Sequence, residues 1–218
     1  MDAYKTDEEQ AESIKRWFRE NGLSLVTGLM LGLAVLFGFK SWTEYGQRNA
    51  EAASNLFVQF TMAAAQETET AVKVYDELIK GFSGSEYAVL ASLQMAKLRL
   101  DDNDVTASQA HLQWALEHAK LDGLKHTARL RLARLNLSAG DADAADKLVA
   151  GINDPSYTVL YEELRGDIAR TRGDMTAAHA AYERALAALP ASQTGRALIE
   201  AKRDDVVGYA ATAAGEAS

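Results

Sequence analysis

The sequence predicts an all-α protein that has a single N-terminal transmembrane helix followed by a helical-repeat solenoid. Only two of the 218 residues are proline, the worst helix former, while alanine, the best, recurs in runs. One segment near the N-terminus is apolar and uncharged over a length that suits a bilayer. The remainder contains hairpin-like segments that recur at a nearly fixed spacing, as in stacked repeats.

The apolar segment lies between Glu20 and Lys40 and contains no charged residue. As a helix, residues 21–39 would span roughly 28 Å, close to the ~30 Å hydrocarbon core of a membrane. Aromatic residues stand at both ends, where the two membrane interfaces are expected: Trp17, Phe18, Trp42 and Tyr45. We therefore predict a transmembrane anchor over residues 21–41.

The charges beside the span predict its orientation. Lys15, Arg16 and Arg19 precede it closely, whereas only Lys40 and the more distant Arg48 follow it. The positive-inside rule then keeps residues 1–20 in the cytoplasm and sends residues 42–218 across the membrane. A cleaved signal peptide is the alternative, but the apolar run is longer than the usual 7–15 residues of such peptides.

Gly28 and Gly32 form a G-x-x-x-G pair on one face of the predicted span. Such pairs allow a second helix to approach closely, so that van der Waals packing drives association in lipid. We predict that these two glycines contact another transmembrane helix. The alternative is that glycine is simply common in membrane helices.

The clearest repeat unit runs from Tyr161 to Pro190 and is expected to form two helices joined at Gly173-Asp174. Small residues at Gly166 and Ala178 would let these helices cross closely, and Tyr182 would fill the groove between hairpins. The spacing resembles the tetratricopeptide repeat. At the early tryptophan position of that repeat, this sequence has Glu162.

Weaker copies lie upstream, over residues 55–80, 91–119 and 128–149. Their small second-helix residues and that of the last unit are Ala71, Ser108, Ala145 and Ala178, at spacings of 37, 37 and 33 residues. These values are near the ~34-residue repeat. A final amphipathic helix over residues 195–209 would cap the exposed apolar end of the stack. The predicted core residues are Leu93, Leu98, Leu112, Leu116, Leu130, Leu132, Leu135, Leu164, Ile168 and Leu186.

Composition and motifs argue against several classes of function. The net charge of -8, with no basic stripe, argues against a nucleic-acid partner. The absence of cysteine excludes disulfides and thiolate chemistry. The four histidines lack zinc-site spacing, and we expect Asp141, Asp143 and Asp146 to cap a helix start. We therefore expect no enzyme activity, no metal and no cofactor.

A helical solenoid binds partners on the surface lined by the first helix of each hairpin. The repeat register places Lys97, Arg134, Asp167 and Arg170 there. We predict that this inner face binds partner proteins, because such charges can hold acidic or C-terminal segments. The alternative is that these are solvated surface ions of little energetic value.

The complete arrangement resembles the YfgM family, the tetratricopeptide-like ancillary subunits of the bacterial Sec translocon. The resemblance is most specific from Glu8 to Trp17, in Asn21-Gly22 and in the span, LSLVTGLMLGLAVLFGFKSW. It implies a bacterial inner-membrane protein with periplasmic repeats. It further implies association with SecYEG and with a periplasmic chaperone of the PpiD type, and assistance to client proteins emerging from the channel. A repeat adaptor for another envelope or cell-wall assembly, anchored only for location, is the alternative.

Overall fold

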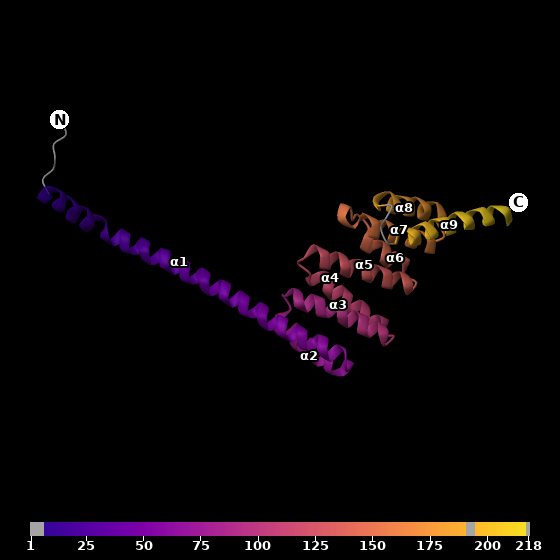
Figure 1. The fold of residues 1–218 in the computed structure, drawn as a ribbon, viewed down its shortest axis with the longest axis horizontal. Coiled ribbons are helices and arrows are strands. Elements are labelled where there is room, and N and C mark those ends of the chain that lie inside the picture. Colours follow the sequence, from indigo (N-terminus) through magenta and orange to yellow (C-terminus); the bar gives the residue numbers. More distant parts are fainter. Residues whose placement is uncertain (1–6, 191–194, 217–218) are drawn as a thin grey trace, which may run out of the picture. The chain divides into compact units, whose positions relative to one another are not determined.

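The structure is a computed structural model that describes residues 7–190 and 195–216, with side chains over 9–190 and 195–207. Within these ranges it contains nine α-helices, one short 3-10 helix and no strand, which confirms the all-α prediction (Figure 1). The chain divides into two compact units, Met1–Ala52 and Ala53–Ser218.

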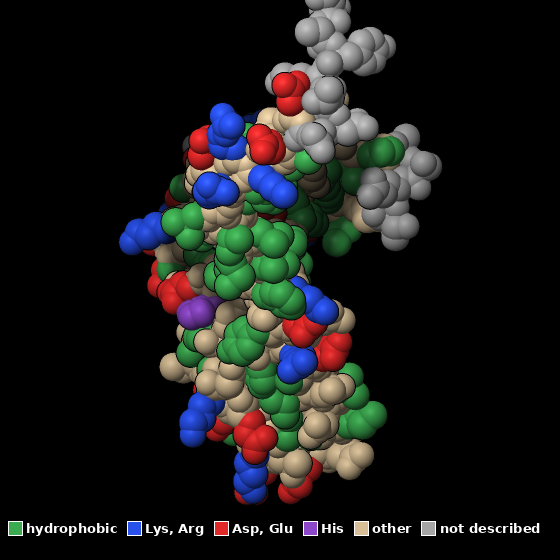
Figure 2. Space-filling model, turned by 90° about the vertical axis from the view of Figure 1, so that its left-hand side faces the viewer, with side chains coloured by type: hydrophobic (Ala, Val, Ile, Leu, Met, Phe, Trp, Pro, Cys, Tyr) green, Lys and Arg blue, Asp and Glu red, His purple; other side chains and the backbone are tan. Residues whose placement is uncertain are grey.

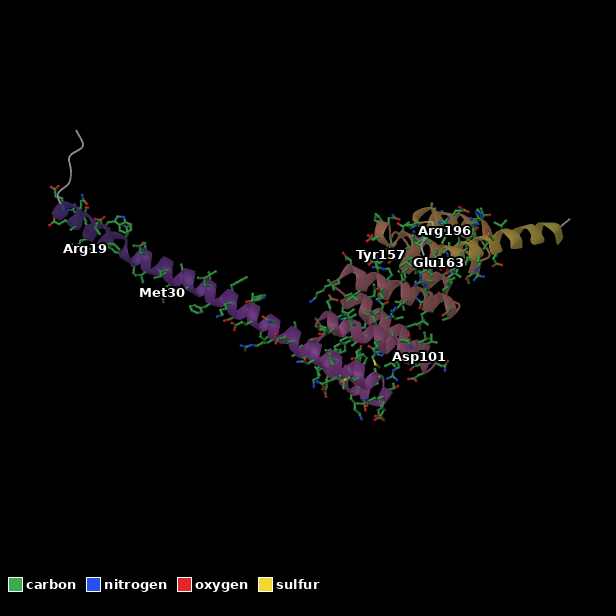
Figure 3. The ribbon with its side chains drawn as sticks, in the orientation of Figure 1. Arg19, Met30, Asp101, Tyr157, Glu163 and Arg196 are labelled. Atoms are coloured by element: carbon green, nitrogen blue, oxygen red, sulfur yellow. The ribbon has the colours of Figure 1, made fainter. Side chains whose placement is uncertain are left out.

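The first unit consists of helix α1 (Asp7–Ala64), whose later residues continue into the second unit. Large apolar side chains between Leu23 and Phe39 are 40 to 82% exposed. An 18-residue window of α1 has a mean hydropathy of 2.1 and is not buried at all, so this helix is long and apolar enough to cross a membrane. Figure 2 shows hydrophobic side chains gathered between groups of charged ones, and Figure 3 labels Arg19 and Met30 along α1.

The second unit is a stack of helical hairpins. The end of α1 packs against α2 (Thr68–Phe82), where the rings of Phe60 and Tyr75 lie 6.2 Å apart. Three further hairpins follow: α3 (Glu86–Asp101) with α4 (Val105–His118), α5 (Asp122–Ser138) with α6 (Ala142–Val149), and α7 (Thr158–Thr171) with α8 (Met175–Ala188). The short helix η1 (Pro155–Tyr157) leads into α7, and α9 (Arg196–Glu216) packs on α8.

The same turn joins the helices of the last three hairpins. A residue with positive φ stands first: Asn103 at 61°, Gly140 at 87° and Gly173 at 79°. An aspartate follows directly, and its carboxylate accepts a hydrogen bond from the backbone N–H three residues later: Asp104, Asp141 and Asp174, at 2.8 to 2.9 Å. The aspartates therefore cap the second helices, as predicted for Asp141.

The other two acidic residues of that segment do not cap the helix. Asp143 and Asp146 instead accept hydrogen bonds from the guanidinium of Arg172, at 2.6 and 3.0 Å. The expectation of capping was thus wrong for these two residues. They lie two and five residues after the capping Asp141, and their carboxylates join α6 to the end of α7 through Arg172.

Small residues lie where the two helices of each hairpin meet. Ala71, Ser108, Ala145 and Ala178 are all at most 1% exposed, as predicted. In the last hairpin the approach is closest, since a Cβ added to Gly166 would lie 2.3 Å from a ring carbon of Tyr182. The phenol of Tyr182 fills the space that the missing side chain leaves, so the predicted close crossing is confirmed, but Tyr182 packs inside its own hairpin and not between hairpins as predicted.

The core is a series of neighbouring clusters along the stack, and each cluster joins successive helices. Eight of the ten predicted core residues are buried, while Leu98 and Leu116 are partly buried against the same clusters. The capping helix begins one residue later than predicted and ends seven residues later. Its Ile199 and Val206 are buried against α8, as a cap requires.

A polar cluster connects α2, α3 and α4. The hydroxyl of Tyr75 lies 3.0 Å from Ser92 Oγ and 3.2 Å from His111 Nδ1. Burial lowers the pKa of the His111 imidazole, and the positive charge of Arg99 lowers it further, against the opposing effect of Asp76 and Asp104. The folded array therefore favours the neutral imidazole.

We expect Gly166→Ala to destabilise the array. Overpacking costs about 1–3 kcal/mol, which exceeds the gain of about 0.5–1 kcal/mol from replacing a helical glycine by alanine. Thermal unfolding of the full chain in detergent, followed by circular dichroism, measures the difference. Gly81→Ala is the matched control, because a Cβ at Gly81 meets no atom within 4 Å. An unchanged midpoint for Gly166→Ala would contradict the proposed close approach.

We also expect the stability of the array to fall as the pH drops below about 6.5, the ordinary pKa of histidine. The pKa of His111 is lowered on folding, so below pH 6.5 the unfolded chain binds its proton more readily and unfolding is favoured. Urea denaturation at pH 7.5 and at pH 5.5 should show a smaller loss for His111→Gln than for the parent protein. Equal losses in both proteins would refute this assignment.

Candidate partner-binding site

The first helices of the last three hairpins, α3, α5 and α7, pack side by side and form one face of the array. We call this surface the first-helix face. The four residues predicted to bind partners lie on these helices: Lys97 on α3, Arg134 on α5, and Asp167 and Arg170 on α7. Lys97, Arg134 and Arg170 are exposed, and Asp167 is half-buried.

A groove of about 440 Å³ opens between α3 and α5, with α4 beneath it. Its floor is apolar, and it is formed by Leu93 and Ala96 of α3, Leu112 of α4 and Leu135 of α5. Leu100 is 44% exposed at the edge of this groove, near the labelled Asp101 at the end of α3 (Figure 3). A cavity of this size and composition can take up a few apolar side chains of a partner.

Three cations stand at the rim of the groove: Lys97, Arg131 and Arg134. Lys97 forms a 2.5 Å ion pair with Asp101, one turn along the same helix, and both side chains are more than half exposed. Arg134 reaches Glu163 only at 3.9 Å. Arg131 has no hydrogen bond or ion pair with any residue of the described segments. Carboxylates of the chain itself therefore neutralise the positive charge of the rim only weakly.

Asp167 lies away from the groove that Lys97 and Arg134 line. Its carboxylate accepts hydrogen bonds from the Tyr182 hydroxyl at 2.8 Å and from Lys202 Nζ at 2.8 Å. Lys202 also donates to Glu163 at 2.7 Å, so Asp167 helps to join α7, α8 and α9. Arg170, one turn further along α7, lies beside the same Tyr182 hydroxyl. The structure thus brings Lys97 and Arg134 to one groove, whereas Asp167 and Arg170 lie outside it.

The ionisation of this second group follows from its geometry. Burial and the bond to Asp167 raise the pKa of Tyr182, so the phenol stays protonated and donates. Burial lowers the pKa of Lys202, but its bonds to Asp167 and Glu163 outweigh that effect and the net shift is upward. Lys202 therefore stays charged at neutral pH, and its bonds to Glu163 and Asp167 hold α9 against α7.

Sequence reasoning missed two features. Arg131 lies three residues before Arg134 on the same side of α5, and this helical spacing could have identified it. Glu162, at the position of the repeat's early tryptophan, is buried and accepts hydrogen bonds from Arg165 at 2.6 Å and Arg184 at 2.7 Å. An ion-pair network thus occupies the place of an aromatic side chain; the helical spacing of Glu162 and Arg165 signals one of its pairs, whereas the pair with Arg184 has no local signal.

The predicted transmembrane contact lies in the first unit. A Cβ added to Gly28 or to Gly32 meets no atom within 4 Å, so this strip of α1 is open to an approaching helix. Four residues separate the two glycines, which places them on the same side of the helix. Among the residues that the structure describes, no group of three side chains could hold a metal ion.

The chain is similar to known proteins over most of its length. The family model of a tetratricopeptide repeat-like domain matches residues 15–208. The ancillary SecYEG translocon subunit of Escherichia coli (strain K12) is 32% identical over 183 residues, which cover 84% of this chain and 88% of that protein. The protein of the same name from Haemophilus influenzae is 27% identical over 84% of this chain and 90% of its own length.

A third relative of that name, from Neisseria gonorrhoeae, is 25% identical over 94% of this chain and 100% of its own length. These matches agree with the family resemblance that was inferred from the N-terminal segment, the span and the repeats. They indicate a scaffold of helical repeats and not an enzyme. The chain therefore belongs to the tetratricopeptide repeat-like family of ancillary SecYEG translocon subunits.

Proposed function

We propose that this protein is an ancillary subunit of the SecYEG translocon that is anchored in the inner membrane and binds other proteins through its repeats. The observation that carries the proposal is the exposed apolar stretch of α1, which contains an open glycine strip. In lipid, such a strip associates with another helix through close packing. The names of the relatives suggest that this helix belongs to the translocon.

The proposed orientation puts residues 1–20 in the cytoplasm, the anchor at residues 21–41 and residues 42–218 in the periplasm. It is supported by the three cations before the span, Lys15, Arg16 and Arg19, against the single nearby Lys40 after it. In this orientation the repeats are on the side where translocated chains emerge from the channel.

The first-helix face is the proposed binding surface for soluble partners. Lys97 and Arg134 are exposed beside the apolar groove and would contact a partner directly. Arg170 is exposed on α7, while Asp167 would act mainly by holding α7 in place. The partners that the resemblance implies are a periplasmic chaperone of the PpiD type and client proteins in transit.

Site-specific photo-crosslinking in intact membranes tests the anchor as a recognition element. Val35 lies seven residues after Gly28 and therefore on the glycine side, whereas Met30 lies two residues from each glycine and on the opposite side. Both side chains are exposed, at 70% and 64%. We expect a photo-reactive residue at position 35 to form adducts with a translocon helix, and one at position 30 to form mainly lipid adducts.

Lipid adducts alone at both positions would overturn the translocon assignment, whereas translocon adducts at position 30 alone would exclude the glycine side as the contact. A third photo-reactive residue at position 134 reports on the repeats. If position 134 formed adducts only with proteins of another envelope assembly while position 35 formed only lipid adducts, the chain would be an adaptor whose anchor serves only for location.

We expect the double substitution Gly28→Leu and Gly32→Leu to reduce copurification of SecYEG about fivefold, because a lost packing term of about 1 kcal/mol has that effect. Ala34→Leu is the matched control, since it adds the same kind of bulk on the other side of the span. Quantitative immunoblotting after mild detergent extraction gives the ratio. Equal recovery from the double variant and the control would exclude the glycine strip as the contact.

A further inference from the structure

We propose that the groove between α3 and α5 binds an extended polypeptide segment in which an apolar residue is flanked by carboxylates. The inference rests on the proposed function only in that such a segment would come from a partner or client at the translocon. It follows from the composition of the groove, the charges at its rim and its length.

The floor requires an apolar side chain. Leu93, Leu112 and Leu135 face the groove together with Ala96. These residues are largely buried by one another, and Leu100 at the edge is 44% exposed. Covering an exposed apolar edge of this kind with another apolar side chain is favourable, since it removes hydrocarbon surface from water.

The rim selects acidic neighbours for that side chain. The whole chain has a net charge of -8, yet Lys97, Arg131 and Arg134 gather around this one groove. No carboxylate lines the groove within the described residues. Because Arg131 lacks a partner in the described chain and Arg134 has only a 3.9 Å one, neither has to break a strong ion pair to bind. A guanidinium can then form two parallel hydrogen bonds with a carboxylate.

The length of the groove favours a short piece of extended chain. Its walls run from Leu93 to Leu100 on α3 and from Arg131 to Ser138 on α5. Seven residues of helix rise roughly 10 Å, which equals about three residues of extended polypeptide. A lipid acyl chain, roughly half of the ~30 Å hydrocarbon core, is too long for this space.

The alternation of side chains in an extended segment completes the proposal. If the middle residue points toward the apolar floor, its two neighbours point away from the floor, where the rim cations stand. An acidic-apolar-acidic triplet therefore matches the groove at each position. The reverse pattern would place charge on the leucines and hydrocarbon beside the guanidinium groups.

Fluorescence anisotropy on the full chain in detergent micelles tests this inference. The probe is a short labelled peptide that contains Asp-Leu-Asp, and its comparisons contain Lys-Leu-Lys and Asp-Ser-Asp. We expect saturable binding of the first peptide, at least about tenfold weaker binding of the other two, and weaker binding of the first at higher salt. Equal binding of all three peptides would overturn the proposal.

Variants assign the binding to the groove. Arg131→Glu and Leu100→Ser should each weaken binding of the Asp-Leu-Asp peptide about tenfold. The matched control is Lys125→Glu, an exposed cation of α5 outside the groove, which should leave binding unchanged. Unfolding midpoints of all three variants show whether the array is intact. If Arg131→Glu and Lys125→Glu weakened binding equally, the attraction would be nonspecific and the groove would not be its site.

Two further measurements separate other occupants and the proposed function itself. Displacement of the peptide by vesicles of phosphatidylglycerol, or a change of oligomeric state in Arg131→Glu, would replace the peptide by a lipid or a second copy and overturn the inference. Copurification of SecYEG with Arg131→Glu should remain normal. If SecYEG were not recovered even with the parent protein while the peptide still bound, the proposed function would fail and the groove inference would stand.

Discussion

The helices of each hairpin can lie close together only where the side chains between them are small. Ala71, Ser108, Ala145 and Ala178 are buried at these crossings, and in the last hairpin Gly166 lets the ring of Tyr182 occupy the space of a side chain. Close crossing brings the apolar stripes of neighbouring hairpins into register, so each hairpin completes the core of the next. The stack therefore depends on small residues as much as on large ones.

Stacking also creates the surface that the chain offers to others. Once α3, α4 and α5 are packed, their apolar residues leave a groove that no single hairpin contains. The polar groups are divided between two tasks: Asp167 and Lys202 fasten the last helices, whereas Arg131 and Arg134 stay available at the groove. The same fold thus separates the charges that hold it together from those that face a partner.

Much of this arrangement could be predicted from the sequence, because it rests on local spacing. The turns at Gly140 and Gly173, the small crossing residues and the exposed apolar span all follow from patterns within one or two repeats. Two ion pairs could not be predicted, that of Asp143 with Arg172 and that of Glu162 with Arg184, because each joins residues many positions apart. The groove was missed for the same reason, although two of its rim cations, Lys97 and Arg134, were identified.

The joint between α6 and α7 combines apolar packing with several polar contacts. Helix α6 has only eight residues, so it has little apolar surface to bury. Polar contacts add to the small apolar contact area. Arg165 donates hydrogen bonds to the carbonyl groups of Val149 and Ile152, and Arg172 donates to the carboxylates of Asp143 and Asp146. Such contacts break at lower cost than a packed core, and salt weakens the exposed ones. Salt should therefore weaken the polar part of this joint, while the packing of Ala145 and Val149 against Leu164 and Ile168 remains.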